Sequence, residues 1–245
     1  MDPAIRLERV TKSFGSRKVL DDVTLDVQKG TAFCLLGRSG TGKSVTLKHI
    51  MGLMQPDGGR VIVGGREVSR LKRQELAEVR QSMGFLFQSA ALFDSITVGE
   101  NVAFPMRRHT DWREAKIREV AKAKLAEVGL EHDYGKMPAD LSGGMRKRAG
   151  LARAMALDPG ILLVDEPSAG LDPITSDEID ELLVGLKKKG TTLVVVTHNI
   201  PSARHVGDEL AFLHEGRVIA RGSAEDLERS EHAMVRTFMR SEGAG

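Results

Sequence analysis

The chain has 245 residues, of which 41% are hydrophobic and 4% aromatic, and it carries a formal net charge of +2. This length accommodates one large α/β domain or two small ones, and the scarcity of aromatic side chains predicts an aliphatic core of the kind found in buried parallel sheets. The nearly balanced charge argues against nucleic-acid binding, while the single cysteine, Cys34, excludes an intrachain disulfide and favours a reducing compartment. The chain starts without a secretory pattern and its apolar runs are too short to cross a membrane, so we expect a cytosolic protein that reaches a membrane only through a partner.

The N-terminal third predicts strands on either side of a glycine-rich loop. Apolar residues alternate strictly over Val23–Val27, as they do in a half-buried strand. A continuous apolar run over Phe33–Leu36 precedes the loop, and helical spacing extends over 45–54 after it. The pair Gly58-Gly59 predicts a turn, which is followed by a strand over 61–63.

The middle of the chain predicts a short buried strand and then a mainly helical segment. The strand covers 85–87 and ends at Gln88. Asp111 and Glu114 have the spacing of a capping box at the start of a helix. One apolar face of that helix is formed by Ile117, Val120, Ala121, Leu125 and Val128. We therefore expect a helical subdomain over 89–158 that interrupts a wound sheet.

The last third predicts two buried strands over 161–164 and 193–196, a hairpin over 210–220 and a final helix with a frayed end. Alternation of strands and helices along the whole chain indicates an α/β fold with a mostly parallel, wound sheet. We expect a single domain over 1–245 with a helical tail over 223–245.

A phosphate-binding motif stands between the strand that ends at Leu36 and the helix that follows it. The motif G-x-x-x-x-G-K-[ST] is formed by Gly37, Arg38, Ser39, Gly40, Thr41, Gly42, Lys43 and Ser44. Glycines let successive backbone N–H groups converge on phosphate oxygens at the positive end of the helix. Lys43 then reaches the β- and γ-phosphates, and Ser44 supplies a ligand to Mg²⁺. The motif alone fits a kinase, a GTPase or an ATPase.

Polar side chains at the carboxyl ends of three other strands narrow the choice. Asp165 and Glu166 follow an apolar strand at the sheet edge where ligands bind in wound α/β proteins. Asp165 suits a Mg²⁺ contact, and Glu166 suits a general base that polarises the attacking water. His198 ends the next strand and suits a γ-phosphate contact, while Gln88 suits Mg²⁺ or the water.

Six motifs taken together resemble the ATPase subunits of ABC transporters over nearly the whole chain, from Ile5 to about Gly222. In chain order they are GRSGTGKS at 37–44, Gln88, LSGG at 141–144, LLVDEP at 162–167, SAGLD at 168–172 and His198. The resemblance implies a P-loop NTPase with a wound sheet, an N-terminal antiparallel β subdomain and an inserted helical subdomain. It also implies ATP and Mg²⁺ as ligands and catalysis by Glu166, His198 and Gln88.

The same resemblance gives a role to a second phosphate-binding turn, Leu141–Gly144. In this family two subunits pack head to tail, and Ser142, Gly143 and Gly144 of one subunit contact the γ-phosphate held by the first loop of the other. A homodimer then encloses two ATP molecules, and hydrolysis to ADP and phosphate releases it and drives transport. Phe14 takes the place of an aromatic residue that stacks on adenine, and Asp172 belongs to the nucleotide-binding set.

Three positions depart from the usual family pattern. Met145 stands where most members have Gln, and we expect activity to survive because the phosphate contacts come from Ser142 and the backbone. Phe14 replaces a common Tyr and keeps the stacking surface. Asn199 replaces a frequent Asp after the histidine.

Three stretches look closest to the MlaF-like, Mce-associated branch of the family: 86–107, 141–159 and 165–176. This branch moves phospholipids between the inner and outer membranes of diderm bacteria. It implies a transmembrane permease dimer, a periplasmic Mce-domain partner, sometimes a STAS-domain subunit, and a peripheral position on the cytoplasmic face of the inner membrane. The permease's coupling helix would dock in a cleft beside Gln88, Ala91, Leu92, Phe93 and Val98.

Other assignments stay open on the sequence alone. A neighbouring ABC importer or lipoprotein-release system shares most of the same motifs. A soluble ABC ATPase acting on nucleic acid or ribosomes usually has two fused cassettes or long coiled coils, and a P-loop phosphotransferase gives no reason for LSGG. The lipid species and the direction of transport are not encoded in these motifs.

Overall fold

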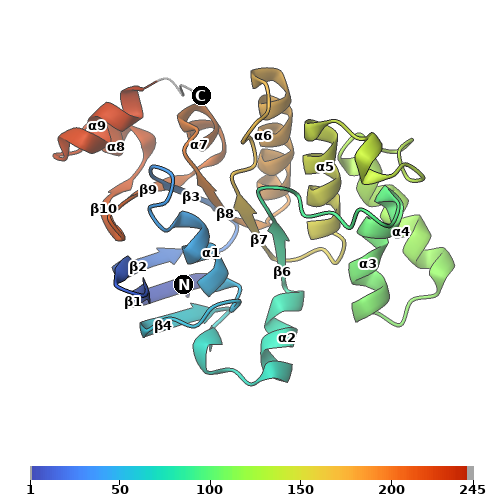
Figure 1. Cartoon of the computed structure of the whole chain (residues 1–245), viewed down its shortest axis with the longest axis horizontal. Helices are drawn as coiled ribbons and strands as arrows, with labels where there is room; N and C mark the ends of the chain where they lie inside the picture. Colours follow the sequence, from blue (N-terminus) through green and yellow to red (C-terminus); the bar gives the residue numbers. More distant parts are fainter. Residues whose placement is uncertain (1, 242–245) are drawn as a thin grey trace.

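The computed structural model describes residues 2–241 and contains a central six-stranded sheet in the order β10-β9-β3-β8-β7-β6 (Figure 1). Strands β3, β8, β7 and β6 are parallel to one another, and β9 is parallel to β3. In this sheet only β10 is antiparallel to its neighbour, β9. The strands are β3 (Ala32–Leu36), β6 (Met83–Leu86), β7 (Ile161–Asp165), β8 (Thr192–Thr197), β9 (Glu209–His214) and β10 (Arg217–Gly222). The predicted wound, mostly parallel sheet is thus confirmed, although β6 ends one residue earlier than expected.

A second, antiparallel sheet has the order β2-β1-β4-β5. Its strands are β1 (Ile5–Phe14), β2 (Arg17–Val27), β4 (Gly58–Val63) and β5 (Arg66–Glu67). The predicted turn at Gly58-Gly59 is wrong, because both residues begin β4. Gly59 has φ +81° where the pairing of β1 with β4 shifts register, and a Cβ there would lie 2.3 Å from the carbonyl oxygen of Arg9. The extra residue is in β1, where Arg9 and Val10 together face Gly59, so the glycine lies opposite a bulge of β1.

Nine helices among residues 2–241 surround the two sheets. They are α1 (Lys43–Ile50), α2 (Arg73–Gln81), α3 (Val98–His109), α4 (Glu114–Glu127), α5 (Gly143–Ala154), α6 (Pro173–Lys188), α7 (Ile200–Val206), α8 (Ala224–Glu228) and α9 (Ala233–Arg240). In Figure 1, α3, α4 and α5 gather at one end of the molecule, and β1, β2 and β4 lie on the other side of the central strands.

Two helix boundaries differ from the predictions. Helix α1 begins at Lys43 and ends at Ile50, four residues short of the expected end, and Gly52 follows with φ +66°. The capping box predicted for Asp111 and Glu114 is wrong: α4 begins at Glu114, its N-cap is Arg113, and no side chain caps it. The predicted apolar face is nevertheless buried or half-buried in the core.

The central strands are buried on both faces and feed two separate hydrophobic cores. In β3, Ala32, Cys34 and Leu36 pack into the core under helices α3–α7, whereas Phe33 and Leu35 pack into the core shared with the antiparallel sheet. The same alternation holds along β7 and β8. Strands buried on both faces hold their carboxyl ends in fixed positions, which matters for every residue of the site described below.

The C-terminal helices pack against the sheet. Leu227, Val235 and Met239 are buried in the core, and the ring of Phe238 lies edge-on to Phe212 with centroids 4.8 Å apart. The frayed end expected for the tail falls on residues outside the described part. Within residues 2–241, no helix is long and apolar enough to cross a membrane.

Candidate nucleotide-binding and catalytic site

The loop between β3 and α1 has a backbone that only glycine permits at its two ends. Gly37 has φ +155° and Gly42 has φ +109°. A Cβ would lie 2.5 Å from the carbonyl oxygen of Leu213 at the first position and 2.8 Å from that of Val19 at the second. Gly42 is also the N-cap of α1 and offers no side chain to the first N–H groups of the helix. These donors are therefore free to bind an anion at the positive end of the helix.

Lys43 lies in the mouth of this loop and is only 5% exposed. Its ammonium donates to the carbonyl oxygens of Gly37, at 2.7 Å, and Arg38, at 3.2 Å. It also lies 3.2 Å from Oε1 of Glu166. A buried cation beside the uncapped N–H groups that begin α1 matches the expected role of Lys43 toward phosphate.

Ser44 and Asp165 meet behind the loop, where β7 ends beside the start of α1. The Ser44 hydroxyl donates to Oδ1 of Asp165 at 2.8 Å. Burial raises the pKa of the Asp165 carboxyl, and the hydrogen bond from Ser44 partly opposes that shift. A hydroxyl and a carboxylate are the hard oxygen donors that Mg²⁺ takes from proteins when phosphate supplies the rest, so these two residues fit the ion.

Glu166 is buried and stands between two basic side chains. Its Oε2 accepts a hydrogen bond from the backbone N–H of His198, at 3.3 Å, and lies 2.9 Å from Nδ1 of the same residue. Its Oε1 faces Lys43. The backbone of Glu166 has φ +46°, a left-handed conformation that is uncommon outside glycine. A carboxylate held between a lysine and a half-exposed histidine is placed to accept a proton from water.

A cavity of about 470 Å³ joins these groups. It is lined by Phe14, Arg17, Val19, Ser39, Gly40, Gly42, Lys43, Ser44, Val45, Gln88, Glu166 and His198. Phe14 is 46% exposed at the end of β1, which leaves its ring free to stack on a planar group. Residues from the antiparallel sheet, the loop and the ends of three central strands thus meet in one space.

The signature turn, Leu141–Gly144, lies outside this cavity, and its Ser142 and Gly143 are exposed. Ser142 is the N-cap of α5, and its hydroxyl accepts the N–H of Met145 at 3.2 Å. Gly144 packs so closely on α6 that a Cβ would lie 2.3 Å from Cγ2 of Thr175. Asp172 is the N-cap of α6 and accepts the N–H of Thr175 at 3.0 Å. Ser142, Gly143 and Asp172 therefore form a second cluster of predicted residues, separate from the first.

Three basic residues near the site did not emerge from the motifs. Arg17 donates to the carbonyl oxygen of Gly40 at 3.0 Å. The hairpin that pairs it with Phe14 could have placed it at the cavity. Lys147 donates to the Glu166 carbonyl at 2.8 Å, and Arg153 donates to those of Ala90 and Ala91 at 2.7 Å each. The contacts of Lys147 and Arg153 join segments far apart in the sequence, so no motif spacing could have predicted them.

Comparison with known proteins places this geometry in a family. The family model described as "ABC transporter" matches residues 20–169. A probable ribonucleotide transport ATP-binding protein, mkl, of Mycobacterium leprae is 43% identical over all of this chain and 71% of its own length. The intermembrane phospholipid transport system ATP-binding protein MlaF of Haemophilus influenzae is 40% identical over 98% of this chain and 92% of its own.

Solved structures agree with the sequence matches. The dimeric ATP-binding cassette MJ0796, in a post-hydrolysis state bound to ADP and phosphate, superposes with a TM-score of 0.84 at 33% identity. The superposition covers 89% of this chain and 98% of that cassette. The predicted ABC ATPase fold is confirmed by this superposition and by the strand order. The chain belongs to the ABC transporter family and is one of its ATP-hydrolysing, ATP-binding subunits.

Proposed function

We propose that this chain powers phospholipid transport between two membranes as the ATPase subunit of a larger transporter. The 40% identity to MlaF over 98% of the chain supports this choice of cargo. The proposal includes a homodimer, a transmembrane permease dimer, a periplasmic Mce-domain partner and a STAS-domain subunit. In it the chain lies peripherally on the cytoplasmic face of the inner membrane.

In this proposal, each residue of the cavity has its own role in binding or hydrolysing ATP. Phe14 stacks on adenine, and the loop of 37–44 holds the phosphates with Lys43 at the β- and γ-positions. Ser44, Asp165 and Gln88 hold Mg²⁺, which when bound neutralises charge on the phosphates. Glu166 takes the proton of the attacking water, and His198 contacts the γ-phosphate. Ser142, Gly143 and Gly144 act on the nucleotide of the partner subunit, with Asp172 beside them.

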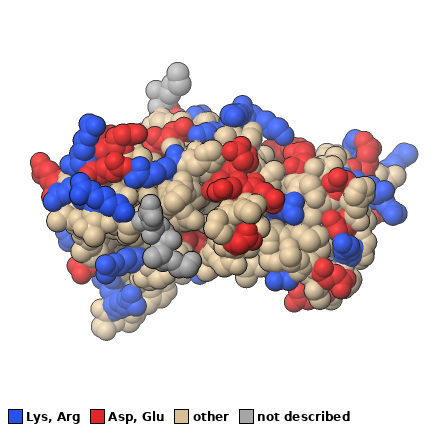
Figure 2. Space-filling view, turned by 90° about the horizontal axis from the view of Figure 1, so that it is seen from above, with Lys and Arg blue, Asp and Glu red and all other residues tan. Residues whose placement is uncertain are grey.

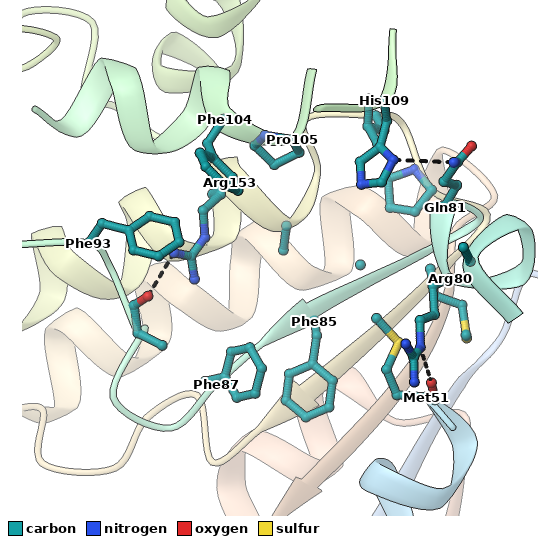
Figure 3. Close-up of a pocket in the computed structure, with 17 residues that line it drawn as sticks. Met51, Arg80, Gln81, Phe85, Phe87, Phe93, Phe104, Pro105, His109 and Arg153 are labelled. Carbon is teal, nitrogen blue, oxygen red and sulfur yellow. Dashed lines mark hydrogen bonds between the residues drawn. The ribbon is translucent and has the colours of Figure 1, made fainter. Parts of the chain in front are cut away.

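A groove next to the cavity supports coupling to a membrane partner. It encloses about 540 Å³ and is lined mainly by apolar and aromatic side chains from α2, β6, the segment after it and α3 (Figure 3). Phe85 and Phe87 stack with centroids 4.2 Å apart, and Phe93 and Phe104 lie 4.9 Å apart. Phe87 lines the groove and Gln88, the next residue, lines the nucleotide cavity. In this proposal, a shift at Gln88 on loss of the γ-phosphate moves the adjacent Phe87 and so reaches the groove.

The charges of the groove indicate the chemistry of its occupant. Arg80, His109 and Arg153 are among its lining residues, which include no Asp or Glu. The guanidinium of Arg80 donates to the carbonyl oxygens of Met51 and Gly52, as Arg153 does to other carbonyls, so neither charge is neutralised by a carboxylate there. An apolar helix that carries one acidic side chain complements this surface.

Two residues of the apolar stretch expected in the docking surface do not line the groove. Val98 is fully buried at the start of α3, so the expectation that it lines the cleft is wrong. Leu92 packs against the core, whereas Ala91 and Phe93 line the groove. The apolar stretch after Gln88 is therefore divided between core and surface.

Cargo and coupling are tested together by reconstitution with the permease. Phe93→Asp, which puts a carboxylate into the groove, is expected to abolish membrane recruitment and transport and to leave ATP affinity within about twofold. Trp112→Asp is the matched control, since Trp112 is 44% exposed and lies outside the groove. Recruitment that survives Phe93→Asp would contradict the docking assignment.

The similarity to the mkl protein favours a second candidate cargo, ribonucleotides. An ATPase subunit contacts the permease and not the cargo, so the two candidates differ in what stimulates the assembled complex. We expect turnover in phospholipid vesicles to rise when the Mce-domain partner is added and to be unaffected by ribonucleotides other than the ATP substrate. Stimulation by ribonucleotides alone would favour the second candidate and leave the ATPase assignment intact.

A further inference from the structure

Helix α5 carries a lysine whose position the roles assigned so far do not explain. Lys147 is 5% exposed, and its ammonium donates to the backbone carbonyl oxygen of Glu166 at 2.8 Å. Burial lowers the pKa of Lys147, against the pull of the nearby Asp165 and Glu166 carboxylates. Moving an ammonium out of water has a free-energy cost, so the burial of Lys147 against a carbonyl oxygen must be offset by a structural or functional gain.

The Glu166 peptide is the feature that this lysine contacts, and it is strained. A left-handed conformation is unfavourable for a residue other than glycine and persists only where its surroundings hold it. The N–H of Glu166 donates to the carbonyl oxygen of Val196 on β8 at 2.9 Å, and its own carbonyl accepts from Lys147. The residue is thus anchored on one side by the sheet and on the other by α5. Its φ and ψ determine where the carboxylate points.

The same helix begins at the signature turn. Ser142 is the N-cap of α5, and Lys147 lies five residues further along. The other end of the helix is also tied to the site, because Arg153 binds the carbonyl oxygens of Ala90 and Ala91, two further left-handed residues just after Gln88. Helix α5 is therefore fixed to backbone on either side of the cavity.

We propose that Lys147 is a positioning residue that fastens the Glu166 turn to the signature helix, so that the carboxylate is aligned only when α5 is in place. The inference rests on the proposed role of Glu166 as the base. Its consequence is that the helix reaching toward the partner's nucleotide and the carboxylate acting on the chain's own nucleotide move as one unit.

The test compares Lys147→Met, which keeps the apolar stem and removes the donor, with Lys147→Gln, which keeps a donor of shorter reach. Misplacing a reacting group by about 1 Å can cost on the order of 10²-fold in rate. We expect kcat to fall by about 10- to 100-fold in Lys147→Met and by less in Lys147→Gln, with the ATP dissociation constant within about twofold in both. Lys188→Met, an exposed lysine on α6, is the control and keeps its kcat.

A double variant separates positioning from a general structural role. In a Glu166→Gln background, Lys147→Met is expected to add no further loss, because the group it positions is gone. The inference is overturned by a kcat of Lys147→Met within twofold of the wild type, by a loss in nucleotide binding instead of kcat, or by an additive loss in the double variant. If Lys147→Met does not fold, Lys147→Leu, which also removes the donor, takes its place, and a wild-type kcat there overturns the inference. Normal turnover in Glu166→Gln alone would instead refute the proposed base.

Discussion

The chain has two glycine-containing turns that each open a helix, and they differ in how much of a phosphate site each completes. The turn before α1 presents uncapped N–H groups and a buried lysine inside a walled cavity. The turn before α5 is exposed, and the hydroxyl of Ser142 already accepts one of the first N–H groups of its helix. The first turn therefore has the groups to hold an anion by itself, whereas the second has those for one face of a site.

This difference shows why similar local sequences can have different functions. Both turns use small residues and the positive end of a helix, which are the ingredients of an anion site. Only the first has two carboxylates, Asp165 and Glu166, brought to it by the end of a central strand. The second has Gly144 pressed against Thr175 and Asp172 capping the adjacent helix, which leaves its outer side free. An outward half-site needs a second molecule to be completed, as in the proposed dimer.

The largest expected effect comes from removing the base while leaving both turns intact. Glu166→Gln should lower kcat by about 10²- to 10⁴-fold, the range for loss of a general base, because the amide cannot take the proton of water. ATP binding should persist, and an ATP-bound dimer should accumulate, as seen by size-exclusion chromatography. Glu178→Gln, an exposed glutamate on α6, is the control. Near-normal turnover in Glu166→Gln would refute the assignment of the base.

The first site could largely be predicted from the sequence, and physical reasons explain both that success and its limits. The loop of 37–44 is contiguous, so its spacing alone determines its geometry. Gln88, Glu166 and His198 follow from a rule of parallel sheets, since the carboxyl ends of neighbouring strands meet at one edge. The cavity brings them together with Phe14, which comes from the antiparallel sheet and was expected here from the family resemblance and not from that rule.

Contacts between distant segments could not be predicted in the same way. Lys147 and Glu166 are 19 positions apart, and Arg153 and Ala91 are 62 apart. Each pair joins a side chain to a backbone carbonyl, which any residue supplies, so the acceptor has no residue type to recognise. The turn expected at Gly58-Gly59 was wrong for a related reason: glycine signals a positive φ, and Gly59 has one inside a strand, opposite a bulge of β1.

A second prediction contrasts one residue from each turn. Lys43→Ala removes a charged donor to phosphate and should weaken ATP binding by about 10- to 100-fold, as measured by titration with a fluorescent nucleotide. Ser142→Arg places a large side chain on the outer turn and should leave ATP binding to the isolated chain within about twofold. Its turnover should nevertheless fall at least about tenfold, since the two half-sites can no longer close.

Mixed dimers decide whether the second turn acts on the partner. With Lys43→Ala in one subunit and Ser142→Arg in the other, both lesions fall into one composite site and the other stays whole. We expect turnover well above that of either homodimer. If mixing restores nothing, ATP-dependent crosslinking between a cysteine in the 37–44 loop of one chain and one in the 141–144 turn of the other decides. Its absence would contradict action across the dimer.

A smaller effect is expected at the position that departs from the family pattern. Met145 is half-buried against the core, and it contributes its backbone N–H to Ser142. Met145→Gln keeps that N–H and has a similar volume, so kcat and ATP affinity should stay within about twofold of the wild type. A change of tenfold or more would show that the side chain takes part in the outer half-site.

The smallest effect on activity is expected at Asp180, in the interior of α6 and away from both turns. Burial raises the pKa of its carboxyl to about 6, and its Oδ1 accepts the hydroxyl of Ser202 on α7 at 2.7 Å. At a pH between the pKa of the unfolded chain and that of the folded chain, this carboxyl is protonated while the chain is folded and releases its proton when the chain unfolds. The free energy of unfolding therefore falls as pH rises from about 4 through 6.

Asp180→Asn carries no charge, and its amide oxygen can still accept the Ser202 hydroxyl. It should be more stable than the wild type at pH 8 by about 1 to 3 kcal/mol, and this advantage should shrink toward zero at pH 4.5 in denaturant titrations. Turnover at pH 8 should not change. An equal stabilisation at both pH values would contradict the titration of Asp180, and a loss of nucleotide binding would show that the interior of α6 reaches the half-site at its N-terminus.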